Sequence, residues 1–133
     1  RLVAGVRAVD PEAVLRGPDP GRTAGDGAAA RLPANAHFTF PGAEGDSLLY
    51  LLDSAGVQAS TGSACQAGVP QPSHVLLAMG VPELEARGAL RFSLGATSTA
   101  ADVDRLVAAL PQVVERARAA GLVSAPAGAG GTA

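Results

Sequence analysis

The lone cysteine of this sequence lies among small residues that offer little to bury it. Cys65 stands between Gly62 and Gly68, and its other close neighbours are Ser, Ala and Gln. A free cysteine is usually a small buried residue, but the two glycines leave this backbone permissive. The predicted loop from Thr61 to Gln71 spans about eleven residues, which exceeds the usual connection of about 4–6 residues. We therefore predict a thiol that meets a substrate and carries a group away, with the thiolate as its reactive form.

Four polar residues are candidates to act with this loop. Arg91 alternates with apolar residues, so it lies on the polar face of a predicted strand. A solvated arginine is the default there, although a guanidinium also suits bidentate recognition of a carboxylate. His74 lies in the first turn of the helix after the loop, and we expect it to hold the far end of the loop; contact with a proton or a persulfide is the alternative. Ser63 either hydrogen-bonds near the thiol or serves a turn, and His37 has sheet packing as its default role.

The spacing of apolar residues predicts the elements that position these side chains. Strands alternate polar and apolar residues, whereas helices repeat apolar residues at intervals of three and four. The predicted strands are 12–16, 36–40, 57–60 and 90–94, and the predicted helices are 1–8, 44–56, 73–80 and 99–120. The apolar residues expected to line the buried faces of the helices include Leu48, Leu51, Leu52, Ala55, Val75, Leu76, Met79, Val103, Leu106, Val107 and Leu110. Thr99 to Asp102 matches a capping box, and Pro111 is expected to kink or restart the last helix.

This order of elements predicts an α/β fold of the α+β sandwich kind. A small sheet of three or four strands, covered by helices on one face, packs these elements most economically. Residues 17–30 contain mainly Gly, Pro, Asp and Ala and are expected to form an exposed loop. Residues 121–133 have little to bury and are expected to form a disordered tail. The expected domain is therefore 1–120.

The composition argues against several classes of protein. The 133 residues carry ten arginines, no lysine and twelve acidic residues, for a net charge of −2, which gives no basic footprint for nucleic acid or an anionic membrane. No apolar run approaches a membrane span, and one cysteine with two histidines falls short of a zinc cage. A single thiol cannot form an internal disulfide, which fits a cytoplasmic location. The only methionine is Met79, so we expect a piece of a longer chain, cut within its first helix.

Several short motifs follow one another between Leu32 and Arg116. They are Leu32–Asn35, Phe38–Phe40, Glu44–Leu49, Ser60–Cys65, Gln71–Leu76, Met79–Gly80 and Leu90–Gly95. This series resembles the C-terminal part of pyridoxal-phosphate-dependent cysteine desulfurases, which belong to the class V aminotransferase group, and its long-loop branch is the closer likeness. The string S-x-G-S-A-C followed by P-S-H-V-L and R-F-S-L-G is far more specific than any single motif. The resemblance implies a mainly antiparallel sheet, as in the C-terminal domain of fold type I pyridoxal-phosphate enzymes.

The resemblance also implies roles for individual residues. Cys65 matches the residue that takes sulfur from L-cysteine, leaving L-alanine, and delivers it as a persulfide to an acceptor protein. That acceptor is expected to be an iron–sulfur scaffold or a tRNA-thiolating enzyme. Arg91 matches the arginine that binds the substrate carboxylate, and the full-length protein is expected to be a homodimer with a large cofactor domain. Pyridoxal phosphate is held on a lysine; this chain has none, so the chain alone is expected to be inactive and to bind no cofactor.

Other interpretations stay open on the sequence. The chain is alternatively a stand-alone sulfur carrier or interaction module, or a fragment of a related class V aminotransferase or selenocysteine lyase. A structural domain with an inert thiol is a further alternative. Gln71 stands where the family commonly has glutamate, and Ala96 stands where the long-loop branch often has arginine. Neither departure touches the thiol, but both weaken assignment to a subfamily.

Overall fold

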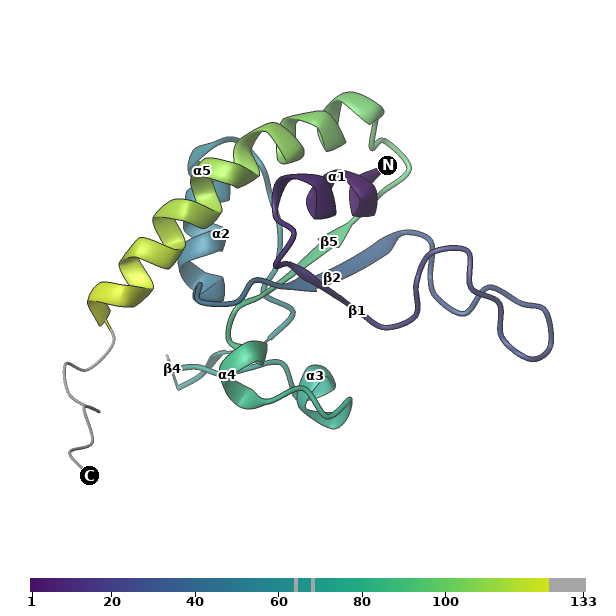
Figure 1. The fold of residues 1–133 in the computed structure, drawn as a ribbon, viewed down its shortest axis with the longest axis horizontal. Coiled ribbons are helices and arrows are strands. Elements are labelled where there is room, and N and C mark those ends of the chain that lie inside the picture. The colour runs from purple at the N-terminus through teal and green to yellow at the C-terminus, as the bar shows by residue number, and fades with distance from the viewer. Residues whose placement is uncertain (64, 68, 125–133) are drawn as a thin grey trace.

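A computed structural model describes residues 1–63, 65–67 and 69–124 of the chain (Figure 1). Helices and strands alternate along it, as the sequence predicts. The elements are α1 (Leu2–Val9), β1 (Val14–Arg16), β2 (Asn35–Thr39), α2 (Gly45–Ser54), β3 (Cys65–Gln66), β4 (Val69–Pro70), α3 (His74–Ala78), α4 (Glu83–Ala86), β5 (Ala89–Ser93) and α5 (Ala100–Ser124). Between β1 and β2 the chain forms the long, largely exposed loop that was predicted for residues 17–30.

The main sheet has three antiparallel strands in the order β1-β2-β5, so β2 is central. Helices α1, α2 and α5 pack on one face of it, whereas α3 and α4 lie on the other side (Figure 1). This confirms the predicted small antiparallel sheet in a mixed α/β fold; α1, α2 and α5 cover one face as expected, whereas α3 and α4 lie outside that layer. The predicted strand 57–60 is wrong in extent, because within the described residues only Ser60 pairs, through an isolated bridge to Arg91.

The core lies between the sheet and its three helices. Side chains alternate across a strand, so every second residue of β2 and β5 points to the helices. Phe38 is fully buried there, and its ring centroid lies 6.2 Å from that of Phe40 and 6.5 Å from that of Phe92. The helices supply the opposing apolar side chains, which are Leu2, Val6, Leu48, Leu52, Val103, Leu106, Leu110, Val113, Val114 and Ala117.

Helix α2 is one turn shorter than the apolar spacing predicts. Leu48 and Leu52 are fully buried and Leu51 is half-buried, but Ala55 is exposed. The helix ends at Ser54, and Ala55 is its C-cap residue. Ala55 therefore leaves the buried face, and its prediction as a core residue is wrong.

Helix α3 buries only one of the three apolar residues predicted for it. Leu76 is fully buried, whereas Val75 and Met79 are about half exposed. A helix of five residues has a single inward position per turn, and Leu76 takes it. Leu76 packs with Val81 and two small residues in a second, minor core under α4, a helix that the sequence did not predict.

Helix α5 begins with the predicted capping box. The Thr99 N–H donates to Asp102 Oδ2 at 2.8 Å, and the Asp102 N–H donates to Thr99 Oγ1 at 3.2 Å. This hydrogen bonding lowers the pKa of Asp102. The helix continues through Pro111 without a restart, although proline lacks the N–H that would bond the carbonyl four residues earlier.

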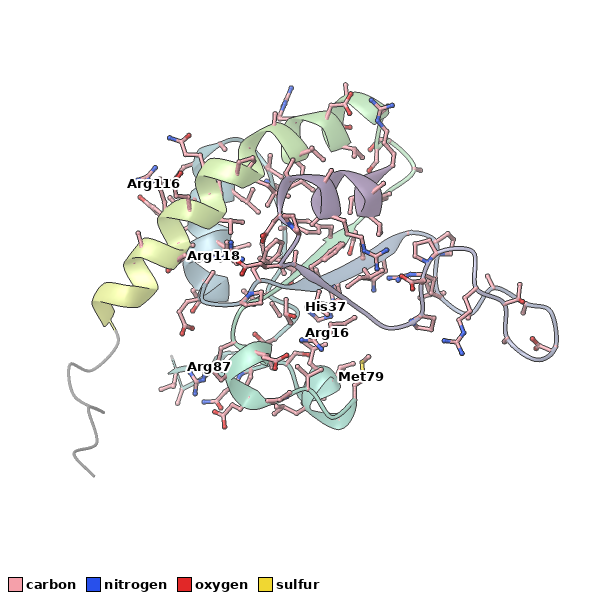
Figure 2. The ribbon with its side chains drawn as sticks, viewed as in Figure 1. Arg16, His37, Met79, Arg87, Arg116 and Arg118 are labelled. Atoms are coloured by element: carbon pink, nitrogen blue, oxygen red, sulfur yellow. The ribbon has the colours of Figure 1, made fainter. Side chains whose placement is uncertain are left out.

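Helix α5 extends past residue 120, where the predicted domain ends. Residues 121–124 of the predicted tail belong to the helix, whereas residues 125–133 lie outside the described part of the chain. Arg118 holds this end of the helix against the domain (Figure 2). It donates to the Pro41 carbonyl at 2.8 Å and pairs with Asp10 at 3.0 Å. None of the helices in the described residues combines the length and the hydropathy that crossing a bilayer requires.

Candidate functional site

Three basic side chains form a row across the sheet face that α1, α2 and α5 leave uncovered. The strand register pairs Arg16 with His37, and His37 with Arg91. Each lies on the face opposite to the buried phenylalanines, because side chains alternate along a strand. Arg16 and His37 are neighbours in Figure 2, between the sheet and the pair α3 and α4. The row therefore combines residues that are up to 75 positions apart in sequence, from Arg16 to Arg91.

Arg91 is the predicted carboxylate ligand, and its backbone is tied to the cysteine loop. The Arg91 N–H donates to the Ser60 carbonyl at 2.6 Å, and the Ser60 N–H donates to the Arg91 carbonyl at 3.2 Å. The side chain is half-buried, and its Nε is enclosed without a hydrogen-bond partner within the described residues. No carboxylate of the described residues forms an ion pair with Arg91. Within the described residues, the Arg91 guanidinium therefore has no acidic partner.

His37 is the functional candidate that the sequence undervalued. Its Nε2 is enclosed and lacks a partner within the described residues. Burial, and then the positive charges of Arg91 and Arg16, lower the pKa of His37 below its ordinary value. The imidazole is therefore neutral at pH 7. Alternation along β2 showed that His37 faces the polar side, but only the register between strands places it beside Arg91.

Gly62, at the start of the cysteine loop, lies directly against the His37 ring. Its φ is +70°, and a Cβ at this position would lie 3.2 Å from His37 Cε1 and 3.3 Å from Nε2. A side chain would therefore meet both backbone strain and a steric clash. This confirms the permissive backbone predicted for Gly62, and it explains why the loop can cross so close to the sheet. Gly68, the second predicted glycine, lies outside the described residues.

The sequence pattern did not indicate a role for Arg16. Its guanidinium forms a hydrogen bond and an ion pair within the domain. Its Nη2 donates to Thr39 Oγ1 at 2.8 Å and to Glu85 Oε2 at 2.6 Å. Only 17% of the side chain is exposed. The Glu85 pair ties α4 to the sheet, so Arg16 has a structural role that leaves Arg91 as the arginine available to a ligand. A strand of three residues gives too little periodicity to mark such a role in advance.

Cys65 lies in a short hairpin rather than in an unstructured loop. Its backbone pairs with Pro70, and Gln66 pairs with Val69. The predicted loop from Thr61 to Gln71 is corrected accordingly, although its first residues remain without regular structure. Ala67, in the turn, has φ of +52°, a conformation that alanine adopts only with strain. The thiol itself lies outside the described atoms, so the placement of Cys65 rests on its backbone.

The two support residues predicted for the loop have different surroundings. Ser63 Oγ lies 3.1 Å from Thr61 Oγ1, and both residues line a cavity of about 30 Å³ beside Gln71 and Arg87. That volume is enough for about one or two water molecules. His74 is exposed at the first position of α3 and has no side-chain hydrogen bond within the described residues. The structure therefore brings Ser63, but not His74, into the packed part of the loop.

The end of the loop is fixed by Ser73 instead of His74. Ser73 is buried, and its Oγ accepts a hydrogen bond of 3.4 Å from the Leu76 N–H. This confirms the predicted cap at Ser73. No group of three metal-ligating side chains is present among the described residues. The candidate site thus combines the hairpin that contains Cys65, the Arg91 guanidinium, which has no ion pair within the described residues, and the neutral imidazole of His37.

Comparisons with known proteins show which proteins this chain is similar to. Residues 16–106 match the family model described as aminotransferase class-V. The chain is 56% identical to an IscS-like cysteine desulfurase of Mycobacterium tuberculosis over 127 residues, which are 96% of this chain and 30% of the relative. It is 43% identical to the cysteine desulfurase IscS of Clostridium botulinum over 89% of this chain and 28% of the relative. The chain thus spans less than a third of these relatives.

Two solved structures show the same fold. A NifS-like protein from Rickettsia africae superposes with a TM-score of 0.65, covering 86% of this chain and 26% of that chain, at 24% identity. A second NifS-like protein superposes with a TM-score of 0.61, covering 86% of this chain and 25% of its own, at 27% identity. The mixed α/β fold with a three-stranded antiparallel sheet is therefore one already known in NifS-like proteins.

Proposed function

Because the chain belongs to the class-V aminotransferase family, we propose that it is the small domain of a longer cysteine desulfurase. In this proposal Cys65 accepts the sulfur of L-cysteine, and Arg91 binds the carboxylate of that substrate. The identity to cysteine desulfurases over nearly the whole chain supports the assignment. Its coverage of about 30% of the M. tuberculosis relative supports a domain rather than a complete enzyme.

The chain does not fit as the holder of the family's cofactor. Pyridoxal phosphate is held as a Schiff base on a lysine amine, and all ten cationic side chains of this sequence are arginines. The lysine, and with it the electron-withdrawing chemistry, therefore belongs to another part of the full-length protein. The contribution of this chain is to bind substrate and to receive sulfur.

The surroundings of the Arg91 guanidinium are the observation that supports its proposed role. Its guanidinium has no acidic partner within the described residues, and its enclosed Nε–H lacks an acceptor. An arginine prepared for an incoming carboxylate has this arrangement, since a planar fork of donors binds carboxylate oxygens in pairs. The backbone bonds between Arg91 and Ser60 hold the start of the cysteine loop beside that guanidinium. These bonds support the proposal because they tie the segment that leads to Cys65 to the strand that carries Arg91.

In this proposal the Cys65 thiolate attacks the sulfur of L-cysteine. An S–S bond forms as the Cβ–S bond of the substrate breaks, and the electron pair left on Cβ takes up a proton to give L-alanine. Cys65 then holds the outer sulfur as a persulfide, which a second protein accepts. An iron–sulfur scaffold and a tRNA-thiolating enzyme are the two proposed kinds of acceptor. A lone thiol suits a reducing compartment, so we place the reaction in the cytoplasm, in a full-length protein that forms a homodimer.

Peptide mapping of the full-length protein tests this function. After incubation with L-cysteine, we expect a persulfide on the peptide that contains Cys65. The Cys65→Ser variant is expected to release no sulfide above background while it keeps the cofactor absorbance, and Ser63→Cys in a Cys65→Ser background provides a matched thiol two residues away. A persulfide only on another peptide, or loss of the absorbance band in Cys65→Ser, contradicts the proposal.

A further inference from the structure

The backbone hydrogen bonds of Arg91 determine how closely it approaches His37. Both the N–H and the C=O of Arg91 bond to Ser60, on the outer side of β5. In an antiparallel ladder the N–H and C=O of one residue point to the same side, so Arg91 and His37 form a non-hydrogen-bonded pair across β5 and β2. Such pairs bring Cα atoms to about 4.5 Å and side chains into contact. The two side chains are therefore held as immediate neighbours.

Each of these neighbours has one enclosed polar atom without a partner. The atoms are His37 Nε2 and Arg91 Nε, and neither has a hydrogen bond within the described residues. A buried polar group without a partner is costly and rare in folded proteins. Arginine can only donate, whereas a neutral imidazole has one nitrogen that accepts. The two unpartnered atoms are thus complementary in chemistry.

The surroundings of His37 keep its ring neutral and in place. Arg16 faces it from β1 and Arg91 faces it from β5, and Gly62 of the cysteine loop packs against the ring. Within the described residues, the ion pair of this row is the one between Arg16 and Glu85 on α4. Two cations and burial lower the pKa of His37, so the accepting nitrogen is available at neutral pH.

We propose that His37 is a positioning residue for Arg91, whose Nε–H donates to His37 Nε2 when a carboxylate binds. This inference rests on the proposed function of Arg91. With Nε engaged by His37, the two terminal nitrogens of the guanidinium form the fork that meets the carboxylate. His37 thereby determines which edge of the guanidinium faces the carboxylate. It acts through Arg91 and contacts neither the substrate nor the thiol.

Binding of two matched ligands to the full-length holoprotein tests this role. L-alanine carries the carboxylate, whereas L-alaninamide replaces it with a neutral amide of similar shape. Titration calorimetry gives both dissociation constants for the wild type, His37→Leu and His37→Gln. We expect His37→Leu to weaken L-alanine about tenfold, as for loss of one hydrogen bond to a charged group, with L-alaninamide unchanged. His37→Gln, which keeps an accepting oxygen, is expected to retain most of the preference for L-alanine.

The pH dependence separates positioning from simple packing. As the pH falls below the pKa of His37, the imidazolium loses its acceptor, so the preference of the wild type for L-alanine should fall; in His37→Gln it should not. Equal weakening of both ligands in His37→Leu, or an unchanged preference, overturns the inference while the proposed function stands. A wild type without any preference for L-alanine overturns the proposed role of Arg91 itself, and persulfide mapping on Cys65 then shows whether the sulfur-accepting role survives.

Discussion

The two faces of the central sheet are made by alternating residues of the same strands, yet they are completed differently. On one face Phe38 and Leu90 are fully buried against three helices. On the other face their chain neighbours His37 and Arg91 each keep an enclosed nitrogen without a partner among the described residues. The apolar face is therefore packed within the described chain, whereas two nitrogens of the polar face are without hydrogen bonds there.

Neighbouring residues of one strand therefore have different surroundings, one in the core and one in the candidate site. Leu90 and Arg91 are adjacent, but one contributes to the core and the other to the site. Real proteins leave local rules unsatisfied mainly at functional sites. Substitutions on the apolar face should accordingly change the free energy of unfolding, whereas substitutions on the polar face should mainly change ligand binding.

The largest effect is expected for Leu90→Ala on the helix-covered face. Leu90 is fully buried, so its truncation should lower the free energy of unfolding of the chain by about 2–5 kcal/mol, from lost burial and the cavity left behind. The matched control is Leu84→Ala on α4, where 81% of the leucine is exposed; its change should stay within about 0.5 kcal/mol. Urea denaturation measures both, and similar values for the two variants contradict the assignment of the core.

Arg91→Gln should affect binding more than folding. Loss of a charge-assisted carboxylate contact, worth about 1.5–3 kcal/mol, should raise the KM of the full-length protein for L-cysteine by roughly 10–100-fold. Arg116→Gln, an exposed arginine on α5, provides the same chemical change away from the row. Steady-state kinetics with thermal melts as the folding control tests this; an unchanged KM in Arg91→Gln would remove Arg91 from the site.

Gly62→Ala should be costlier than the same change at another glycine with positive φ. Gly56 has φ of +77° and nothing within 4 Å of a Cβ, so Gly56→Ala meets backbone strain alone, about 1–2 kcal/mol. Gly62→Ala adds the contact at 3.2 Å with the His37 ring. The excess of Gly62 over Gly56 in denaturant unfolding should be about 1 kcal/mol, as for mild overpacking. Equal effects mean that the loop does not press on His37.

The smallest predicted effect is a pH slope from His37. Folding lowers the pKa of His37 from its ordinary value of about 6.5. Below pH 6.5, His37 is therefore protonated to a greater extent in the unfolded chain than in the folded chain. The free energy of unfolding should therefore fall as the pH drops through 6.5 towards the folded pKa, more shallowly than the 1.4 kcal/mol per unit of one full proton. His37→Gln should flatten this slope in urea titrations at several pH values, while His74→Gln, at an exposed histidine, should keep it.

The sequence predicted those parts of the fold that follow from local pattern. Alternation marked β2 and β5, and Thr99 with Asp102 marked the start of α5. Helix α4 has four residues, too few for a periodic signal, and the hairpin at Cys65 contains no apolar alternation. Pro111 was expected to kink or restart the helix, and α5 continues through it without a restart, with Leu110 and Val114 buried on either side.

The candidate site was predictable only in part, for a different reason. Cys65 and Arg91 follow from motif resemblance, and their roles stay predictions until they are tested. His37 and Arg16 joined the site through strand register, which depends on pairing between distant segments. The alternation within one strand predicts which face of the sheet a residue lies on, but it does not predict which residue lies beside it on the next strand. That pairing depends on the strand register, which could not be predicted from this sequence.

The anchors at Ser60 and Ser73 have a consequence for how the thiol can be varied. Ser60 is clamped by two backbone bonds to β5, and Ser73 is a buried helix cap. The bonds that form these anchors are made by residues at the two ends of the segment, and each inserted residue adds up to roughly 3.5 Å of reach. Insertion or deletion in the hairpin turn should therefore change how far the residue at position 65 reaches, while Arg91 stays where β5 holds it.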